Sequence, residues 1–253
     1  MGNPLAGKGV VVTRPRELAA GLAALVESAG GRAWRFPAIE IHAPSDPAAA
    51  DRVLAHLDAF DIAVFVSPTA AQKALARGLR LSPAQRVFAL GAGTRAELAR
   101  RGIDAQAPGA RADSESLLQS PDLQALAGKR VILLCGEGGR ELLGDTLASR
   151  GATVERAEVY RRALPAADPG PLLEAWHAGR VHAVTATSSE GVANLFTLLG
   201  AAGGGRLRET PLFVPHPRVA DAARRQGVRE PVVAGPSDEE MLARLVAYFD
   251  VHG

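Results

Sequence analysis

The stretch Gly7-Lys8-Gly9-Val10-Val11-Val12 decides the fold, because it returns about 121 positions later as Gly128-Lys129-Arg130-Val131-Ile132-Leu133. Both stretches place a short β-branched run after a glycine and a lysine. A second pair of segments, 87–103 and 212–228, matches in the same way. The chain therefore contains an internal duplication, which predicts two similar lobes. Clefts between lobes are common binding sites for small ligands.

Short β-branched runs alternate with longer helical patterns in both copies. The first copy predicts strands at 9–13, 62–66 and 87–90 and helices at 18–29, 70–75 and 94–101. The second copy predicts strands at 131–134, 183–186 and 212–214 and helices at 140–150, 190–199 and 219–226. Alternation of this length indicates parallel sheets flanked by crossover helices, so the predicted fold class is α/β. The glycine run 203–205 is predicted to be a flexible loop.

Two segments interrupt the alternation at equivalent positions of the two copies. Residues 36–41 and 157–163 each follow a strand-like stretch and lead into a Pro-rich polar stretch, so we interpret them as linkers. If they pair as crossing linkers, the first lobe is discontinuous and comprises 1–37 and 164–253, and the second lobe comprises 40–161. Taken alone, the sequence equally permits a simple split near residue 125.

Composition excludes several classes of protein. The 253 residues are 47% apolar and 22% charged, which is typical of soluble globular proteins. The 29 basic residues barely exceed the 27 acidic ones, so no nucleic-acid partner is expected. A single cysteine, Cys135, excludes an internal disulfide framework, and the six histidines show no metal-ligand spacing, so no metal site is expected. No apolar run approaches the ~18 residues of a membrane span. A cytoplasmic monomer without a membrane partner is expected.

Small polar residues gather at the turns where predicted strands pass into helices. Ligands of parallel sheets bind at such turns, and helix N-termini offer N–H groups and partial positive charge to carboxylates or phosphates. The candidate binding residues are Arg14, Ser67, Thr69, Gly91, Gly93, Thr94, Gly138, Arg140, Thr187, Ser188, Ser189, Pro217 and Arg218. A purely structural role as helix caps remains open for the 91–94 turn and for the serines.

Motifs for nucleotide binding and for nucleophilic hydrolysis are missing. The chain has no Walker A loop, no dinucleotide-binding glycine pattern and no Gly-x-Ser-x-Gly elbow.

Tyrosine is more informative, because the chain has only two and Tyr160 lies in a predicted linker that should border the cleft. The structural alternative for Tyr160 is a half-buried aromatic side chain that fixes the linker.

Several segments together resemble the uroporphyrinogen-III synthase family in the family's order. They are Val10–Pro15, Phe36–Ile41, Phe65–Ala70, Ala89–Thr94, Gly138–Leu143, Val159–Arg162 and Thr187–Glu190. The resemblance covers essentially the whole chain. It implies two flavodoxin-like lobes joined by a two-stranded linker, with one lobe discontinuous.

The resemblance also implies an activity. Family members are cyclising lyases that convert hydroxymethylbilane, a linear tetrapyrrole, into uroporphyrinogen III with loss of water and inversion of ring D, on the route to haem, sirohaem and cobalamin. No cofactor is implied. The eight carboxylates of this substrate suit turns rich in helix N-termini. Tyr160 matches the tyrosine that is proposed in the family as the acid assisting departure of the hydroxyl group.

One turn departs from the family pattern. Many members carry a Gly-Pro-Thr-Thr-like turn where this chain has Pro215-His216-Pro217-Arg218. The family's threonine contact is therefore not carried over, and Arg218 is predicted to bind a substrate carboxylate directly.

Two other functions compete with this one. The first is a non-catalytic two-lobed binding protein for an anionic metabolite. The second is a nucleotide-dependent transferase that uses the 91–94 turn, which the missing phosphate loop argues against. Conversion of hydroxymethylbilane to the type III isomer separates the enzyme from both.

Overall fold

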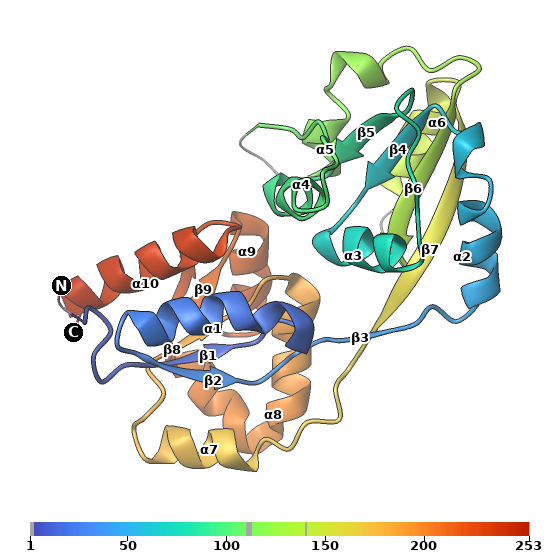
Figure 1. Cartoon of the computed structure of the whole chain (residues 1–253). Helices are drawn as coiled ribbons and strands as arrows, with labels where there is room; N and C mark the ends of the chain where they lie inside the picture. Colours follow the sequence, from blue (N-terminus) through green and yellow to red (C-terminus); the bar gives the residue numbers. More distant parts are fainter. Residues whose placement is uncertain (1–2, 110–112, 140, 253) are drawn as a thin grey trace. The chain divides into compact units, whose positions relative to one another are not determined.

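The computed structural model of the chain describes residues 3–109, 113–139 and 141–252. The chain divides into two compact units (Figure 1). Unit 1 comprises 1–40 together with 163–253, and unit 2 comprises 41–162. Unit 1 is thus built from two separate parts of the chain, and the described part of each unit forms one five-stranded sheet.

Unit 1 is built on a parallel sheet with the strand order β10-β9-β8-β1-β2. Its strands are β1 (Gly9–Val12), β2 (Arg32–Arg35), β8 (Ala183–Thr185), β9 (Leu212–Val214) and β10 (Pro231–Val233). Its helices are the short 3-10 turn η1 (Arg16–Leu18), α1 (Ala19–Ser28), α7 (Gly170–His177), α8 (Ser189–Glu209), α9 (Pro217–Arg225) and α10 (Asp238–His252).

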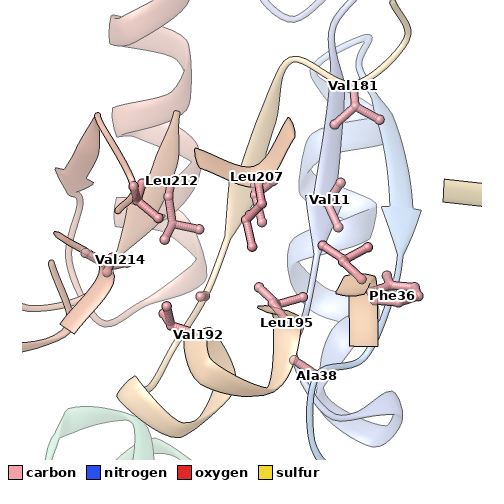
Figure 2. Packing of buried hydrophobic residues seen from close by; sticks show 14 of the residues in the cluster. Val11, Phe36, Ala38, Val181, Val192, Leu195, Leu207, Leu212 and Val214 are labelled. Carbon is pink, nitrogen blue, oxygen red and sulfur yellow. The ribbon is translucent and has the colours of Figure 1, made fainter. Parts of the chain in front are cut away.

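Both faces of this sheet are covered, which explains why its central strand β1 is apolar throughout. Val10 and Val12 point into a core cluster shared with α1 and α10. Val11 points to the opposite face, where α7, α8 and α9 contribute buried side chains such as Leu195 (Figure 2). Successive strand residues face opposite sides, so a strand covered on both faces reads as a continuous hydrophobic run.

Unit 2 has the sheet order β3-β7-β6-β4-β5, in which β7, β6, β4 and β5 pair in parallel. Its strands are β3 (Glu40–His42), β4 (Ile62–Phe65), β5 (Arg86–Ala89), β6 (Arg130–Gly136) and β7 (Thr153–Ala163). Its helices are α2 (Pro47–Leu54), η2 (Leu57–Ala59), α3 (Pro68–Ala76), α4 (Ala92–Ala99), α5 (Ser114–Leu117), η3 (Pro121–Leu123) and α6 (Leu142–Ser149). The predicted α/β class, with parallel sheets flanked by helices, is confirmed.

Each unit of the folded chain combines strands from both sequence copies. In unit 1, β1 from the first copy pairs with β8 from the second. In unit 2, β6 from the second copy pairs with β4 from the first. The chain passes between the units at β3 and at the end of β7, which are neighbours in the sheet of unit 2. Within the predicted linker at 157–163, Ala157, Glu158 and Tyr160 are paired with β6 and belong to that sheet.

The predicted loop at 203–205 is wrong, because these glycines lie inside α8. The helix is interrupted only at Gly200, whose backbone has φ 56° and ψ −156°. A Cβ atom added to Gly203 would lie 2.8 Å from both Leu173 Cδ2 and Leu199 Cβ. Glycine is therefore required by the close packing of α7 on α8, and a flexible linker has no such requirement.

The glycine run provides a paired test of this packing. We expect Gly203→Ala to lower the free energy of unfolding by about 1–3 kcal/mol, as overpacking of a close contact does. Gly205→Ala should instead raise it by up to ~1 kcal/mol, because nothing lies within 4 Å of a Cβ there and alanine favours a helix. Urea unfolding of both variants measures the difference. Equal effects of the two changes would contradict the packing role of Gly203.

Candidate functional site

Tyr160 lies at the carboxyl end of the sheet of unit 2, next to the N-terminus of α3. Its hydroxyl oxygen is 3.2 Å from Ser67 Oγ. Ser67 is the N-cap of α3, and its Oγ also accepts a hydrogen bond of 3.0 Å from the backbone N–H of Ala70. The phenol, the serine hydroxyl and the first turn of the helix therefore form one polar cluster.

A β-bulge in β7 directs Tyr160 towards this cluster. Cys135 of β6 pairs with Glu158, but the next residue, Gly136, pairs with Tyr160, so Val159 is an extra residue. Adjacent residues of a regular strand point to opposite faces, yet Val159 and Tyr160 both join the same core cluster, which also contains residues of α3. Bulges commonly redirect a side chain in this way.

Gly136 makes room for the tyrosine ring. A Cβ atom at this position would lie 2.6 Å from Tyr160 Cζ, which is too close for any real contact. The next residue, Glu137, donates its backbone N–H to the Tyr160 carbonyl at 2.9 Å, and its carboxylate accepts from the N–H and hydroxyl of Ser45. Tyr160 is only 4% exposed, so its ring is held more tightly than the half-buried aromatic of the structural alternative.

The 91–94 turn lies beside the start of α3. A Cβ atom on Gly93 would be 3.6 Å from Pro68, the first residue of α3. Gly91 is the N-cap of α4, and among the described residues no side chain caps this helix. Its first N–H groups are thus better placed for an anionic ligand than those of a side-chain-capped helix. Thr69 and Thr94 are buried, at 8% and 3% exposed.

The turn after β6 contains the remaining candidates of unit 2. Gly138 has φ +66°, a left-handed conformation that favours glycine. It borders an open pocket of about 370 Å³ that is also lined by Arg156 and Glu158 of β7. Arg140 lies outside the residues that the structure describes.

Arg14 follows β1 in unit 1 and has an acidic partner that the sequence did not suggest. Its guanidinium forms an ion pair of 2.7 Å with Asp238 at the start of α10, and the two side chains are 19% and 20% exposed. Gly21 of α1 leaves space for this carboxylate, since a Cβ there would lie 2.6 Å from Asp238 Oδ2. Arg14 is therefore held in place, and a guanidinium has further donors for a ligand.

The other candidates of unit 1 surround the starts of α8 and α9. Ser188 is the N-cap of α8 and accepts a hydrogen bond of 3.0 Å from the N–H of Gly191. Thr187 and Ser189, on either side of it, are partly buried. Pro217 is the first residue of α9, where its missing N–H costs nothing, and Arg218 is exposed beside it.

Cys135 of β6 is a buried thiol close to the Tyr160 cluster, and its strand partner is Glu158 of β7. Burial raises the pKa of its thiol, which disfavours a thiolate nucleophile at neutral pH.

Within the described ranges, no group of three or more His, Cys, Asp or Glu side chains could hold a metal ion. No described helix has the length and apolar character needed to cross a bilayer.

Comparison with known proteins gives consistent matches over most of the chain. The family model described as "Uroporphyrinogen-III synthase HemD" matches residues 20–243. The uroporphyrinogen-III synthase of Salmonella typhimurium LT2 is 36% identical over 244 residues, which cover 94% of this chain and 99% of that protein. The Escherichia coli K12 enzyme of the same name is 36% identical over 246 residues, with the same coverage.

Solved structures share the fold. A mutant uroporphyrinogen III synthase from the extremely thermophilic bacterium Thermus thermophilus has a TM-score of 0.63 at 24% identity and covers 97% of this chain and 98% of its own. The synthetase from Helicobacter pylori 26695 has a TM-score of 0.58 at 15% identity and covers 95% of this chain and 99% of its own. At these identities, the likeness concerns the fold.

The contact between Gly136 and the tyrosine ring can be tested by adding one methyl group. Gly136→Ala should displace Tyr160 from Ser67 and lower the free energy of unfolding by about 1–3 kcal/mol, the usual cost of overpacking. Gly144→Ala in α6 is a suitable control, because its nearest neighbour would be at 3.5 Å, an ordinary contact. Chemical unfolding and a crystal structure of the variant measure the two effects. An unmoved ring in a fully stable variant would refute the packing argument.

Proposed function

Because the chain belongs to the uroporphyrinogen-III synthase family, we propose that it cyclises hydroxymethylbilane to uroporphyrinogen III with loss of water and inversion of ring D. The observation that carries the proposal is the Tyr160 hydroxyl group, fixed at the N-terminus of α3 by a bulge and a glycine. A group that donates a proton must be positioned before it is useful, and these contacts position it.

The substrate carboxylates meet a protein that is close to electrically neutral overall. Helix N-termini at the strand ends of each unit bind them through backbone N–H groups, and the uncapped start of α4 is the best supported of these positions. Arg14 contributes a guanidinium that Asp238 keeps oriented. Binding of a polyanion therefore depends on local geometry rather than on a large positive field.

Tyr160 acts as the general acid. The electron-rich pyrrole of ring A expels its hydroxyl group, and the phenol proton converts that group into water as the carbon–oxygen bond breaks. A phenol is one of the side-chain groups that can donate a proton in general acid catalysis. Binding then holds ring D so that its substituted α-carbon attacks the ring A methylene carbon. The bond from that α-carbon to the methylene group of ring C breaks, and this methylene group re-forms its bond at the other α-carbon of ring D, which loses its proton. A difference of about 2.7 kcal/mol between two closure barriers is enough for a hundredfold preference for the inverted isomer.

The proposal is tested with Tyr160→Phe, which retains the ring and removes the hydroxyl group. We expect kcat to fall by about 10²- to 10⁴-fold, the usual contribution of a general acid, with the melting temperature nearly unchanged. Freshly prepared hydroxymethylbilane is supplied, the products are oxidised, and the type I and type III isomers are separated. The wild-type protein should form type III.

Tyr248→Phe is the matched control, because Tyr248 is the other tyrosine of the chain and its hydroxyl binds Glu230 in unit 1, at 2.9 Å. This variant should turn over normally. A wild-type protein that leaves only the spontaneous type I product would instead support a binding protein, and full turnover of Tyr160→Phe would reduce Tyr160 to a packing residue.

Arg218 offers a second measurement at the start of α9. Arg218→Ala should raise KM about fivefold with little change in kcat, as expected for the loss of roughly 1 kcal/mol from an exposed charge pair. Arg224→Ala on the same helix removes an equal charge that is already paired with Asp221 at 2.8 Å, and its KM should stay at the wild-type value. Equal KM values for both variants would exclude a substrate contact at Arg218.

A further inference from the structure

We infer that Ser67 is a positioning residue that acts through Tyr160: it donates its hydroxyl proton to the phenol oxygen and so leaves the phenol proton available for the substrate. This inference rests on the proposed function. The two oxygens are 3.2 Å apart, and their separation permits either one to be the donor. The surrounding hydrogen bonds and the reaction decide between the two arrangements.

The serine hydroxyl has one proton and two acceptor positions. One acceptor position is used by the N–H of Ala70, as the N-cap of α3 requires. If Tyr160 donated to Ser67, its proton would be occupied inside the protein and could not reach the departing hydroxyl group. If Ser67 donates to Tyr160, the phenol proton is free for transfer. Only the second arrangement serves a general acid.

The same arrangement stabilises the product of proton transfer. The Tyr160 O–H bond breaks, its proton joins the departing hydroxyl oxygen, and that oxygen leaves as water with the electron pair of the carbon–oxygen bond. The phenolate then accepts the Ser67 hydrogen bond and lies at the start of α3, where the helix dipole favours negative charge. After cyclisation, the phenolate recovers the proton that the unsubstituted α-carbon of ring D loses.

The duplication supplies an internal comparison. The two copies are offset by about 121 positions. Ser67 of one copy therefore corresponds to Ser188 of the other, and Tyr160 corresponds to Ile39. Ser188 caps α8 in the same way, and a Cβ on Gly191 in its first turn would lie 3.8 Å from Ile39 Cδ1. The helix cap is thus retained in both units, whereas the phenol beside it occurs only in unit 2. Capping and positioning are separable roles of the serine.

Two substitutions at Ser67 separate these roles. Ser67→Gly removes the hydroxyl group but remains an acceptable N-cap, whereas Ser67→Thr keeps both the hydroxyl group and the cap. We expect Ser67→Gly to lower kcat by about 10- to 100-fold, the effect of losing a hydrogen bond to a charged oxygen, with KM changed less than about threefold. Ser67→Thr should restore kcat to within about threefold of wild type.

Stability and spectroscopy exclude a general structural effect. Asp46→Ala removes a comparable N-cap from α2 in the same unit, where Asp46 accepts a 2.9 Å hydrogen bond from Ala49, and should leave kcat unchanged. In a Tyr248→Phe background, the ¹³C resonance of Tyr160 Cζ should shift in Ser67→Gly and stay fixed in Asp46→Ala. A fall in kcat without a resonance shift would overturn the inference.

A double substitution distinguishes failure of this inference from failure of the proposed function. In the Tyr160→Phe background, Ser67→Gly should have no further effect on kcat, because the serine acts only through the phenol. An undiminished effect of Ser67→Gly in that background would overturn the positioning role, as would a rise in KM alone, which indicates a direct substrate contact. Full activity of Tyr160→Phe by itself refutes the general acid independently of Ser67.

Discussion

The pairing of β1 with β8 is the constraint on which the architecture depends. Two buried side-chain hydrogen bonds join these strands: Thr13 donates to the Thr185 carbonyl at 2.6 Å, and Thr185 donates to the Val11 carbonyl at 3.0 Å. Each bond spans more than 170 residues of sequence. Because β1 is used in this way, the chain must leave unit 1 after β2 and return to it, and unit 2 is formed in between.

The elements of the fold were largely predictable because hydrophobic periodicity is a local signal. The valines of β1 and the apolar run of β6 indicated buried parallel strands, and both strands are covered on both faces. The role of the glycine run was not predictable in this way. Gly203 fits α8 because of Leu173, thirty residues earlier, and no local pattern reports such a contact.

The candidate site was also predictable only in part, namely in those features that depend on local sequence. The rarity of tyrosine and the position of Tyr160 singled it out, and the helix-capping serines could be expected from their place before helices. The bulge at Val159 could not, because it is a property of the register between two strands. Asp238 likewise became visible as the partner of Arg14 only when α10 was placed beside β1. The local sequence thus identified the candidate reactive side chains, whereas the contacts that hold them in place became known only from the tertiary structure.

Ile39 holds in the first unit the place that Tyr160 holds in the second, because the two positions correspond in the repeat. The serine N-caps of α3 and α8 are alike, so both copies keep the same helix start and differ in the side chain beside it. Divergence at one duplicated position has thus replaced a hydroxyl group by hydrocarbon without changing the turn that supports it. Under the proposed mechanism, proton donation is thereby assigned to one copy of the repeat alone.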